Sequence, residues 1–218
     1  ENSPRERDSV HGVFNAHYDA LPTKVSMNKV RDKWNRVYSE NQVVGLPAAV
    51  LTENDSILPV KGMALDLACG LGSNSLFLEA RGLEVHAWDI SKVAVSSLTE
   101  RVDSLQLNIQ TRVVNITAAA LPVESYDLVI TTHYLDRSLP PAILNATLPG
   151  GLICYQTFTA EKQANIGPSN PEYLLQPNEL QSFVPNCEIL AFKDESQNTN
   201  KDHPLAGRAF IIARKPRS

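Results

Sequence analysis

The sequence predicts an α/β fold in which a mainly parallel sheet is covered by helices on both faces. From Gly62 onward, short apolar segments alternate with amphipathic segments, a pattern typical of parallel strands joined by crossover helices. The first apolar segment, residues 63–67, runs into a glycine-containing loop and then a helix. With 218 residues the chain is long enough for one sizeable core and short for two. We therefore expect a single domain.

The N-terminal part is predicted to hold an arm followed by a helix. Residues 1–26 are polar, mixed in charge and without a sustained hydrophobic period, which indicates a loosely ordered arm. Residues 27–41 carry apolar side chains at helical spacing: Val30, Trp34, Val37 and Tyr38. With a short helical turn at 48–51, this segment predicts a helical lid, residues 27–51, at the start of a single domain that covers residues 27–218.

The remaining elements follow from the period of the apolar residues. Strands are expected at residues 63–67, 84–88, 111–114, 126–131, 152–158, 189–192 and 209–213. Helices are expected at residues 76–80, at 95–105 behind an N-cap at Ser91, at 142–148 and at 179–183. Pro149-Gly150-Gly151 predicts a turn before the fifth strand. The polar connection between the last two strands indicates an antiparallel hairpin.

The loop at residues 66–72 suggests a cofactor site. It places backbone N–H groups at the carboxyl edge of the sheet, where such folds bind ligands. A side chain at Gly70 or Gly72 would block close approach of the ligand or demand a disfavoured φ. Nicotinamide and flavin proteins use G-x-G-x-x-G, but here the third position is Ser75 and an acid, Asp66, opens the loop. Because a carboxylate repels pyrophosphate, the loop suits a cationic cofactor without phosphate, such as S-adenosylmethionine (SAM).

A second acid, Asp89, ends the next strand and can accept hydrogen bonds from a ribose diol. Two alternatives stay open beside a SAM-dependent enzyme. One is an NAD-dependent oxidoreductase, against which Asp66 and the missing third glycine argue. The other is a non-catalytic SAM-binding module, which would bind the cofactor without transferring a methyl group.

Composition excludes several classes of protein. The net charge of −4 argues against a nucleic-acid partner, so we expect a small-molecule acceptor. The three cysteines are too scattered for a disulfide framework or a zinc site, and the histidines show no metal-ligand spacing, so no metal is expected. No apolar segment is long enough to cross a bilayer and no secretory signal is recognised, which predicts a cytoplasmic protein without a membrane partner. A monomer or a homodimer would fit.

With these residues in place, the chain resembles the class I SAM-dependent methyltransferases, and among them the small bacterial tellurite-resistance-type methyltransferases. The resemblance covers about residues 32–216. It rests on the segments Lys33-Trp34-Asn35-Arg36-Val37-Tyr38, Ala64-Leu65-Asp66-Leu67-Ala68-Cys69-Gly70, Trp88-Asp89-Ile90-Ser91, Tyr126-Asp127-Leu128-Val129, Tyr134-Leu135-Asp136-Arg137, Leu148-Pro149-Gly150-Gly151 and Gly167-Pro168-Ser169-Asn170-Pro171.

The resemblance implies a Rossmann-like sheet of seven strands in the order 3-2-1-4-5-7-6, with strand 7 antiparallel. It also implies SAM as the cofactor, lying across strands one, two and four. The residues implied to bind it are Asp66, Ala68, Gly70 and Gly72 at the methionine end, Asp89 and Ile90 at the ribose, Asn115 and Ile116 at the adenine, and in addition Asn74 and Thr132. Ala68 stands where the family often has glycine, and Asn115 where aspartate is common.

Four further residues have both a structural and a functional interpretation. Trp34 and Tyr38 either form the apolar face of a packed helix or cover the sulfonium as an aromatic lid. His133 and Tyr134 follow the fourth strand at the edge where an acceptor would approach, His133 as a candidate general base and Tyr134 as a candidate positioning residue. The predicted reaction is methyl transfer by in-line displacement. The acceptor stays open between an oxyanion such as tellurite, a thiol, an amine and a carboxylate.

Overall fold

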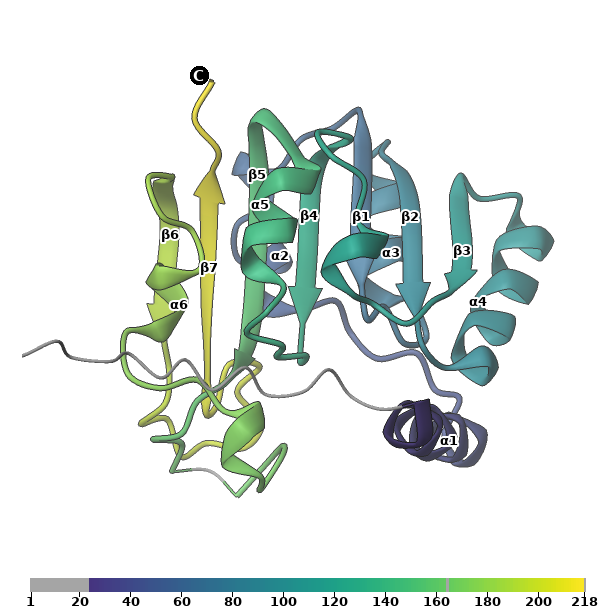
Figure 1. Cartoon of the computed structure of the whole chain (residues 1–218), viewed down its shortest axis with the longest axis horizontal. Helices are drawn as coiled ribbons and strands as arrows, with labels where there is room; N and C mark the ends of the chain where they lie inside the picture. Colours follow the sequence, from purple (N-terminus) through teal and green to yellow (C-terminus); the bar gives the residue numbers. More distant parts are fainter. Residues whose placement is uncertain (1–23, 164, 218) are drawn as a thin grey trace, which may run out of the picture.

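The computed structural model describes residues 24–163 and 165–217 (Figure 1). Its strands form one seven-stranded sheet in the order β3-β2-β1-β4-β5-β7-β6, in which β7 is antiparallel to both neighbours. The strands are β1 (Met63–Leu67), β2 (Glu84–Asp89), β3 (Ile109–Val113), β4 (Tyr126–Thr132), β5 (Thr147–Phe158), β6 (Glu188–Asp194) and β7 (Arg208–Arg214). The predicted topology is confirmed, including the C-terminal hairpin.

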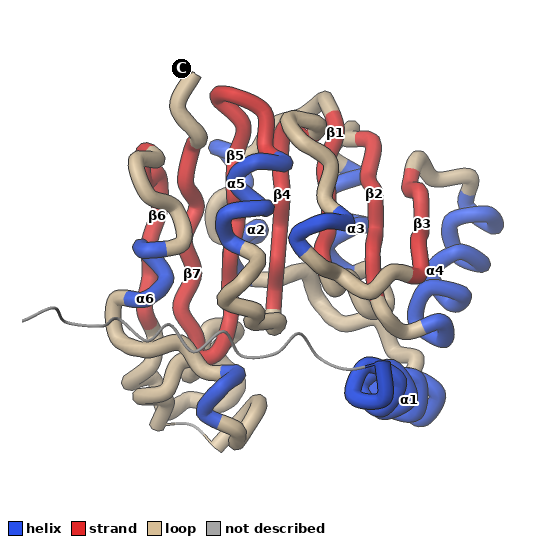
Figure 2. The backbone as a smooth tube through the Cα atoms, viewed as in Figure 1, coloured by secondary structure: helices blue, strands red, loops and turns tan. Residues whose placement is uncertain are grey.

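The helices connect these strands and cover the sheet (Figure 2). The α-helices are α1 (Lys24–Glu40), α2 (Ala49–Thr52), α3 (Ser73–Ala80), α4 (Lys92–Leu105), α5 (Pro140–Ala146) and α6 (Glu179–Ser182), with 3-10 turns at η1 (Asp55–Ile57), η2 (Ala118–Ala120) and η3 (Pro171–Tyr173). Because α1 begins at Lys24, residues 24–26 are helical although they were assigned to the arm. The rest of the predicted arm, residues 1–23, lies outside the described residues.

The sheet separates two apolar clusters. One cluster packs α3 and α4, through Leu78 and Leu98, against one face of the sheet. The other packs α5, through Ile143, against the opposite face. Neighbouring residues of β1 alternate between them, with Ala64 in the first cluster and Leu65 in the second. This alternation is the period of two that a strand buried on both faces requires.

The start of β5 differs from the prediction. The segment Pro149-Gly150-Gly151 was expected to be a turn, but the strand begins at Thr147 and runs through it. The backbone there is paired, since Gly150 N–H donates to the Lys215 carbonyl and Lys215 N–H donates to the Gly151 carbonyl. Gly150 has φ +81 and the register to β4 shifts at this point. The glycine therefore bends the strand instead of ending it.

The carboxyl edge of the sheet faces helix α1. In Figure 1 the arrowheads of β2 and β4 point toward the side of the sheet on which α1 lies. Asn35 of α1 holds the helix there, because its Oδ1 accepts hydrogen bonds from Ser91 Oγ at 2.9 Å and from the Val93 backbone N–H at 3.4 Å. Ser91 is the predicted N-cap of α4 and its hydroxyl accepts from the Ala94 N–H. Helix α1 is thus anchored to the start of α4.

Gly72 offers a test of how α4 packs against the loop between β1 and α3. It has φ +84, and a Cβ built there would lie 2.5 Å from Leu98 Cδ1. We expect Gly72→Ala to lower the free energy of unfolding by about 2 to 6 kcal/mol, measured by urea denaturation, because left-handed backbone and overpacking each cost about 1 to 3 kcal/mol. Gly45→Ala is the control, since nothing lies within 4 Å of its Cβ. Equal stability of the two variants would contradict the packing described.

Candidate active site

The loop between β1 and α3 is fastened to the end of β2. Cys69 N–H donates to the Trp88 carbonyl at 3.1 Å, and Gly70 N–H donates to Asp89 Oδ2 at 2.9 Å. The other carboxylate oxygen of Asp89 accepts from the Ser91 backbone N–H at 2.7 Å. Asp89 therefore connects the glycine loop with the start of α4. Burial raises the pKa of its carboxyl group, while the hydrogen bonds from Ser91 and Gly70 oppose that rise.

Asp66 lies deeper, with no exposed surface. Its Oδ2 accepts a hydrogen bond of 2.6 Å from the Ser75 hydroxyl, while its buried Oδ1 has no hydrogen-bond partner in the described part of the chain. Burial raises the pKa of Asp66 to about 7, and the Ser75 hydrogen bond opposes the rise. A buried carboxylate oxygen without a donor is costly, so this position favours a ligand that brings an N–H group.

Ser75 contacts the candidate site, although it was not proposed as a site residue from the sequence. It stands at the third position of the G-x-G-x-x-G spacing, where a glycine would supply no hydroxyl. Because α3 places it one turn from the loop, its side chain reaches back to Asp66. The signal was available: a hydroxyl residue in place of the third glycine, behind an acid at the end of the first strand.

The glycines of the loop are needed for protein contacts. Gly70 has φ +53, and a Cβ there would lie 2.6 Å from the Tyr38 hydroxyl. At Gly72 the neighbour is Leu98. Both residues have the positive φ that is one of the two expected reasons for glycine, and a Cβ at either position would meet a protein side chain. Ala68, at the family's frequent glycine position, also has a positive φ, +58.

Tyr38 of α1 lies beside Gly70 of this loop, and Trp34 stacks on Tyr38. The rings of Trp34 and Tyr38 are stacked, with centroids 5.8 Å apart and an angle of 28° between the planes. Tyr38 is half-buried, Trp34 is 37% exposed, and neither ring belongs to the two apolar clusters of the sheet. Burial and the negative charge of Asp89 raise the pKa of Tyr38, so its phenol is neutral. These contacts favour a cover for the loop over the interpretation as core.

Asn74 and Thr132, both predicted from the resemblance, contact each other. Asn74 Nδ2 donates to Thr132 Oγ1 at 2.9 Å, and Asn74 Oδ1 accepts from the Ala48 backbone N–H at 2.9 Å. The buried amide thus joins the first turn of α3, the end of β4 and the residue before α2. It aligns these three elements around the carboxyl edge.

The residues predicted to lie beside the ribose and the adenine have fewer contacts with the glycine loop. Ile116 is buried in the cluster that contains Ile143, and Ile90 is half-buried. Asn115 is exposed, and the described contacts do not link it to the glycine loop. The backbone before it is fixed, because Val114 N–H donates to the Asp89 carbonyl at 2.8 Å. The ends of β2 and β3 therefore lie together.

Gln156 is a second residue that sequence reasoning missed. It is 1% exposed near the end of β5, and its Oε1 accepts from the Val50 backbone N–H at 2.8 Å. Its Nε2 lies 3.5 Å from His133 Nε2. A polar side chain within the apolar strand 152–158 was the available signal, but its partners are far away in the sequence.

His133 and Tyr134 follow β4, as predicted. His133 has φ +55, and its backbone N–H donates to the Gln156 carbonyl at 2.8 Å. The residue is partly exposed, and desolvation by neighbouring protein atoms together with the charge of Arg208 lowers the pKa of His133 to about 4. Tyr134 is half-buried, and burial and the charge of Asp136 raise its pKa. Both side chains are neutral at pH 7.

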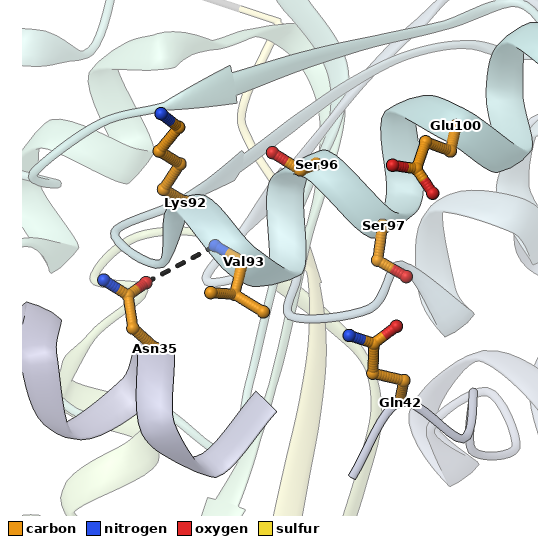
Figure 3. Close-up of a pocket in the computed structure, with 7 residues that line it drawn as sticks. All are labelled: Asn35, Gln42, Lys92, Val93, Ser96, Ser97 and Glu100. Atoms are coloured by element: carbon orange, nitrogen blue, oxygen red, sulfur yellow. Dashed lines mark hydrogen bonds between the residues drawn. The ribbon is translucent and has the colours of Figure 1, made fainter. Parts of the chain in front are cut away.

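A separate hollow lies between α1 and α4 (Figure 3). This open pocket of about 330 Å³ is lined by polar side chains, among them Asn35, Lys92 and Glu100. None of the predicted cofactor or catalytic residues lines it. We therefore centre the candidate site on the glycine loop, where the buried Asp66 oxygen without a partner lies.

Two further searches cover the described residues. No group of three or more His, Cys, Asp and Glu side chains in residues 24–163 and 165–217 is arranged to hold a metal ion. In the same part of the chain, no helix combines the length and the apolar character needed to span a bilayer.

Comparison with known proteins identifies the family. The model of the family described as tellurite resistance protein TehB matches residues 30–207. The chain belongs to this family. The TehB-family resemblance predicted from the sequence is thereby confirmed. A relative from Haemophilus influenzae, named probable S-adenosyl-L-methionine-dependent methyltransferase TehB, is 28% identical over 201 residues, covering 86% of this chain and 67% of that protein.

Solved structures agree with the TehB assignment. The crystal structure of TehB from Haemophilus influenzae matches with a TM-score of 0.62 and 25% identity, over 84% of this chain and 67% of that one. Phosphoethanolamine N-methyltransferase 1 from Haemonchus contortus, solved with phosphoethanolamine and S-adenosylhomocysteine, matches with a TM-score of 0.66 over 90% of this chain and 50% of that one. At 16% identity the second match shows the fold alone. The predicted enzyme class and cofactor, a methyltransferase that uses SAM, are those of the TehB family.

Proposed function

We propose that this chain binds SAM at the glycine loop and transfers its methyl group to a small-molecule acceptor. The observation that supports the proposal most directly is the fully buried Oδ1 of Asp66, which has no partner among the described residues. A positively charged N–H donor satisfies such an oxygen, and the ammonium of SAM is one. When bound, SAM supplies a methyl group that is electrophilic because it sits on a sulfonium.

Different residues of the chain are proposed to contact different parts of SAM. Asp66 pairs with the ammonium. Asp89 binds the ribose, since each carboxylate oxygen accepts more than one hydrogen bond and the bonds from Gly70 and Ser91 leave capacity free. The remaining proposed contacts are with Ala68, Gly70, Gly72, Asn74, Ile90, Asn115, Ile116 and Thr132. Trp34 and Tyr38 cover the sulfonium, where aromatic faces attract the cation and exclude water.

The acceptor is proposed to lie beside His133 and Tyr134. Both directly follow β4, whose last residue, Thr132, is linked by Asn74 to the helix after the glycine loop. An acceptor that is already nucleophilic needs alignment more than acid-base catalysis. Holding two reactants in line in a dry site supplies up to about 7 to 11 kcal/mol in favourable intramolecular cases. We propose that this alignment is the main contribution of the protein.

Calorimetry with purified protein tests the cofactor. We expect saturable heat with SAM and with S-adenosylhomocysteine, and none with NAD at the same concentration. Binding of NAD without binding of either SAM-related ligand would overturn the proposal.

Transfer is tested separately with methyl-labelled SAM and a panel of acceptors that includes tellurite, small thiols, amines and carboxylates. We expect label in at least one product. Binding of SAM with no labelled product across the panel would favour the non-catalytic SAM-binding module.

A further inference from the structure

The amide of Gln156 has its orientation set by the backbone. Val50 N–H can only donate, so the atom 2.8 Å from it is the amide oxygen of Gln156. The other end of the amide is then the NH₂ group, which points at His133 Nε2 over 3.5 Å. An NH₂ group can only donate, so His133 Nε2 has to accept. In a neutral imidazole the proton is then on Nδ1.

The surroundings of the ring oppose a positive charge. His133 lies beside Phe158, with ring centroids 5.5 Å apart. The guanidinium of Arg208, on β7, stands 4.3 Å from the centre of the Phe158 ring, and Lys162 Nζ stands 5.7 Å from it. Burial first, and the charge of Arg208 second, lower the pKa of His133 to about 4. No carboxylate is among the groups that shift this pKa.

A general base works best when its pKa is near the working pH and when a lone pair is free. The Nε2 lone pair of His133 is not free, since it faces the Gln156 amide, and the pKa of His133 is shifted below its usual value. Its Nδ1–H has no partner among the hydrogen bonds of the described residues, so a hydrogen-bond acceptor can use it.

We propose that Gln156 is a positioning residue that holds His133 as a neutral imidazole with its proton on Nδ1, so that His133 donates a hydrogen bond to the methyl acceptor and removes no proton from it. The tautomer of His133 is independent of the proposed function. Only the statement that Nδ1–H donates to the methyl acceptor rests on that function. An acceptor held in this way attacks with a lone pair that it already has, and the proton of His133 stays on Nδ1 throughout. The site therefore selects acceptors that are unprotonated at the attacking atom near pH 7.

The test is ¹⁵N NMR of the full chain without any ligand. The chain has five histidines, and comparison with His133→Gln assigns the signals of His133. We expect a protonated Nδ1 and an unprotonated Nε2, with no titration between pH 5.5 and 8. A proton on Nε2, or a pKa of His133 near 6.5, would overturn the proposal.

Gln156→Glu provides the matched variant. A carboxylate can still accept from Val50 N–H, but its second oxygen would face His133 Nε2 and accept from it. We expect the proton to move to Nε2 and the pKa of His133 to rise by about 1 to 3 units, as for an ionisable group beside an opposite charge. An unchanged His133 spectrum in this variant would contradict the role of Gln156. Calorimetry with SAM, done separately, decides the proposed function whatever the tautomer.

Discussion

Replacing Asp89 by alanine is expected to weaken SAM binding by about 10- to 100-fold and to destabilise the protein as well. The first effect follows from losing hydrogen bonds between a charged group and the ribose, which contribute about 1.5 to 3 kcal/mol. The second follows from the backbone N–H groups of Gly70 and Ser91, which would lose their acceptor. Leaving each buried donor unpaired costs about 1 to 3 kcal/mol.

Calorimetry with SAM and urea denaturation measure the two effects of Asp89→Ala. Glu84→Ala is the matched control, because it removes a carboxylate from the opposite end of the same strand. Glu84 accepts from the Gln110 side chain in an exposed pair, so its loss should change stability by less than about 0.5 kcal/mol. Asp89→Ala with undiminished SAM affinity would contradict the placement of the ribose.

The strands and the two acids at the carboxyl edge could be predicted because both depend on local pattern, whereas the order of the strands was implied by the family resemblance. Apolar segments such as residues 126–131 mark strands, and a side chain at the end of a parallel strand lies at the ligand-binding edge. The start of β5 was mispredicted because Pro149-Gly150-Gly151 has the composition of a turn. Its pairing with Lys215, near the other end of the domain, has no local signal.

The polar contacts of the site could not be predicted for a related reason. Gln156 bonds to a backbone group 106 residues away, and Asn35 bonds to the start of α4, 56 residues away. Such pairs depend on the folded arrangement of distant elements. The same holds for Asp89, which was predicted as a ribose ligand and is in addition the acceptor that fastens the glycine loop.

Replacing Asp66 by asparagine is expected to weaken SAM binding and to stabilise the protein without ligand near pH 8. The amide keeps the shape of the carboxyl group but cannot offer the ammonium a negative charge, which corresponds to a loss of about 10- to 100-fold in affinity. In the free protein, by contrast, the carboxylate is fully buried with one oxygen unpartnered. Removing that charge removes an unfavourable burial.

The contribution of Asp66 to the free energy of unfolding changes with pH. The pKa of Asp66 is about 7 in the folded chain, against an ordinary value of 3.8. Between those values the folded protein binds more protons than the unfolded chain, so the free energy of unfolding falls as pH rises from about 4 to about 7. Above pH 7 the contribution of Asp66 to the free energy of unfolding no longer changes with pH. The fall should be smaller in Asp66→Asn, which urea denaturation at a series of pH values measures.

The affinity for SAM should change with pH in the opposite direction to the free energy of unfolding. Because the ammonium favours the ionised carboxylate, SAM affinity in the wild-type chain should rise up to about pH 7, with release of a proton below that pH. Calorimetry in two buffers of different ionisation enthalpy measures that proton. Ser75→Ala keeps the carboxylate but removes the hydrogen bond that lowers its pKa, so it should bind SAM with the rise displaced to higher pH. Asp66→Asn should lose the rise altogether. If it instead kept the full pH dependence, the titrating group would be another residue, and the ammonium would have to be placed elsewhere in the site.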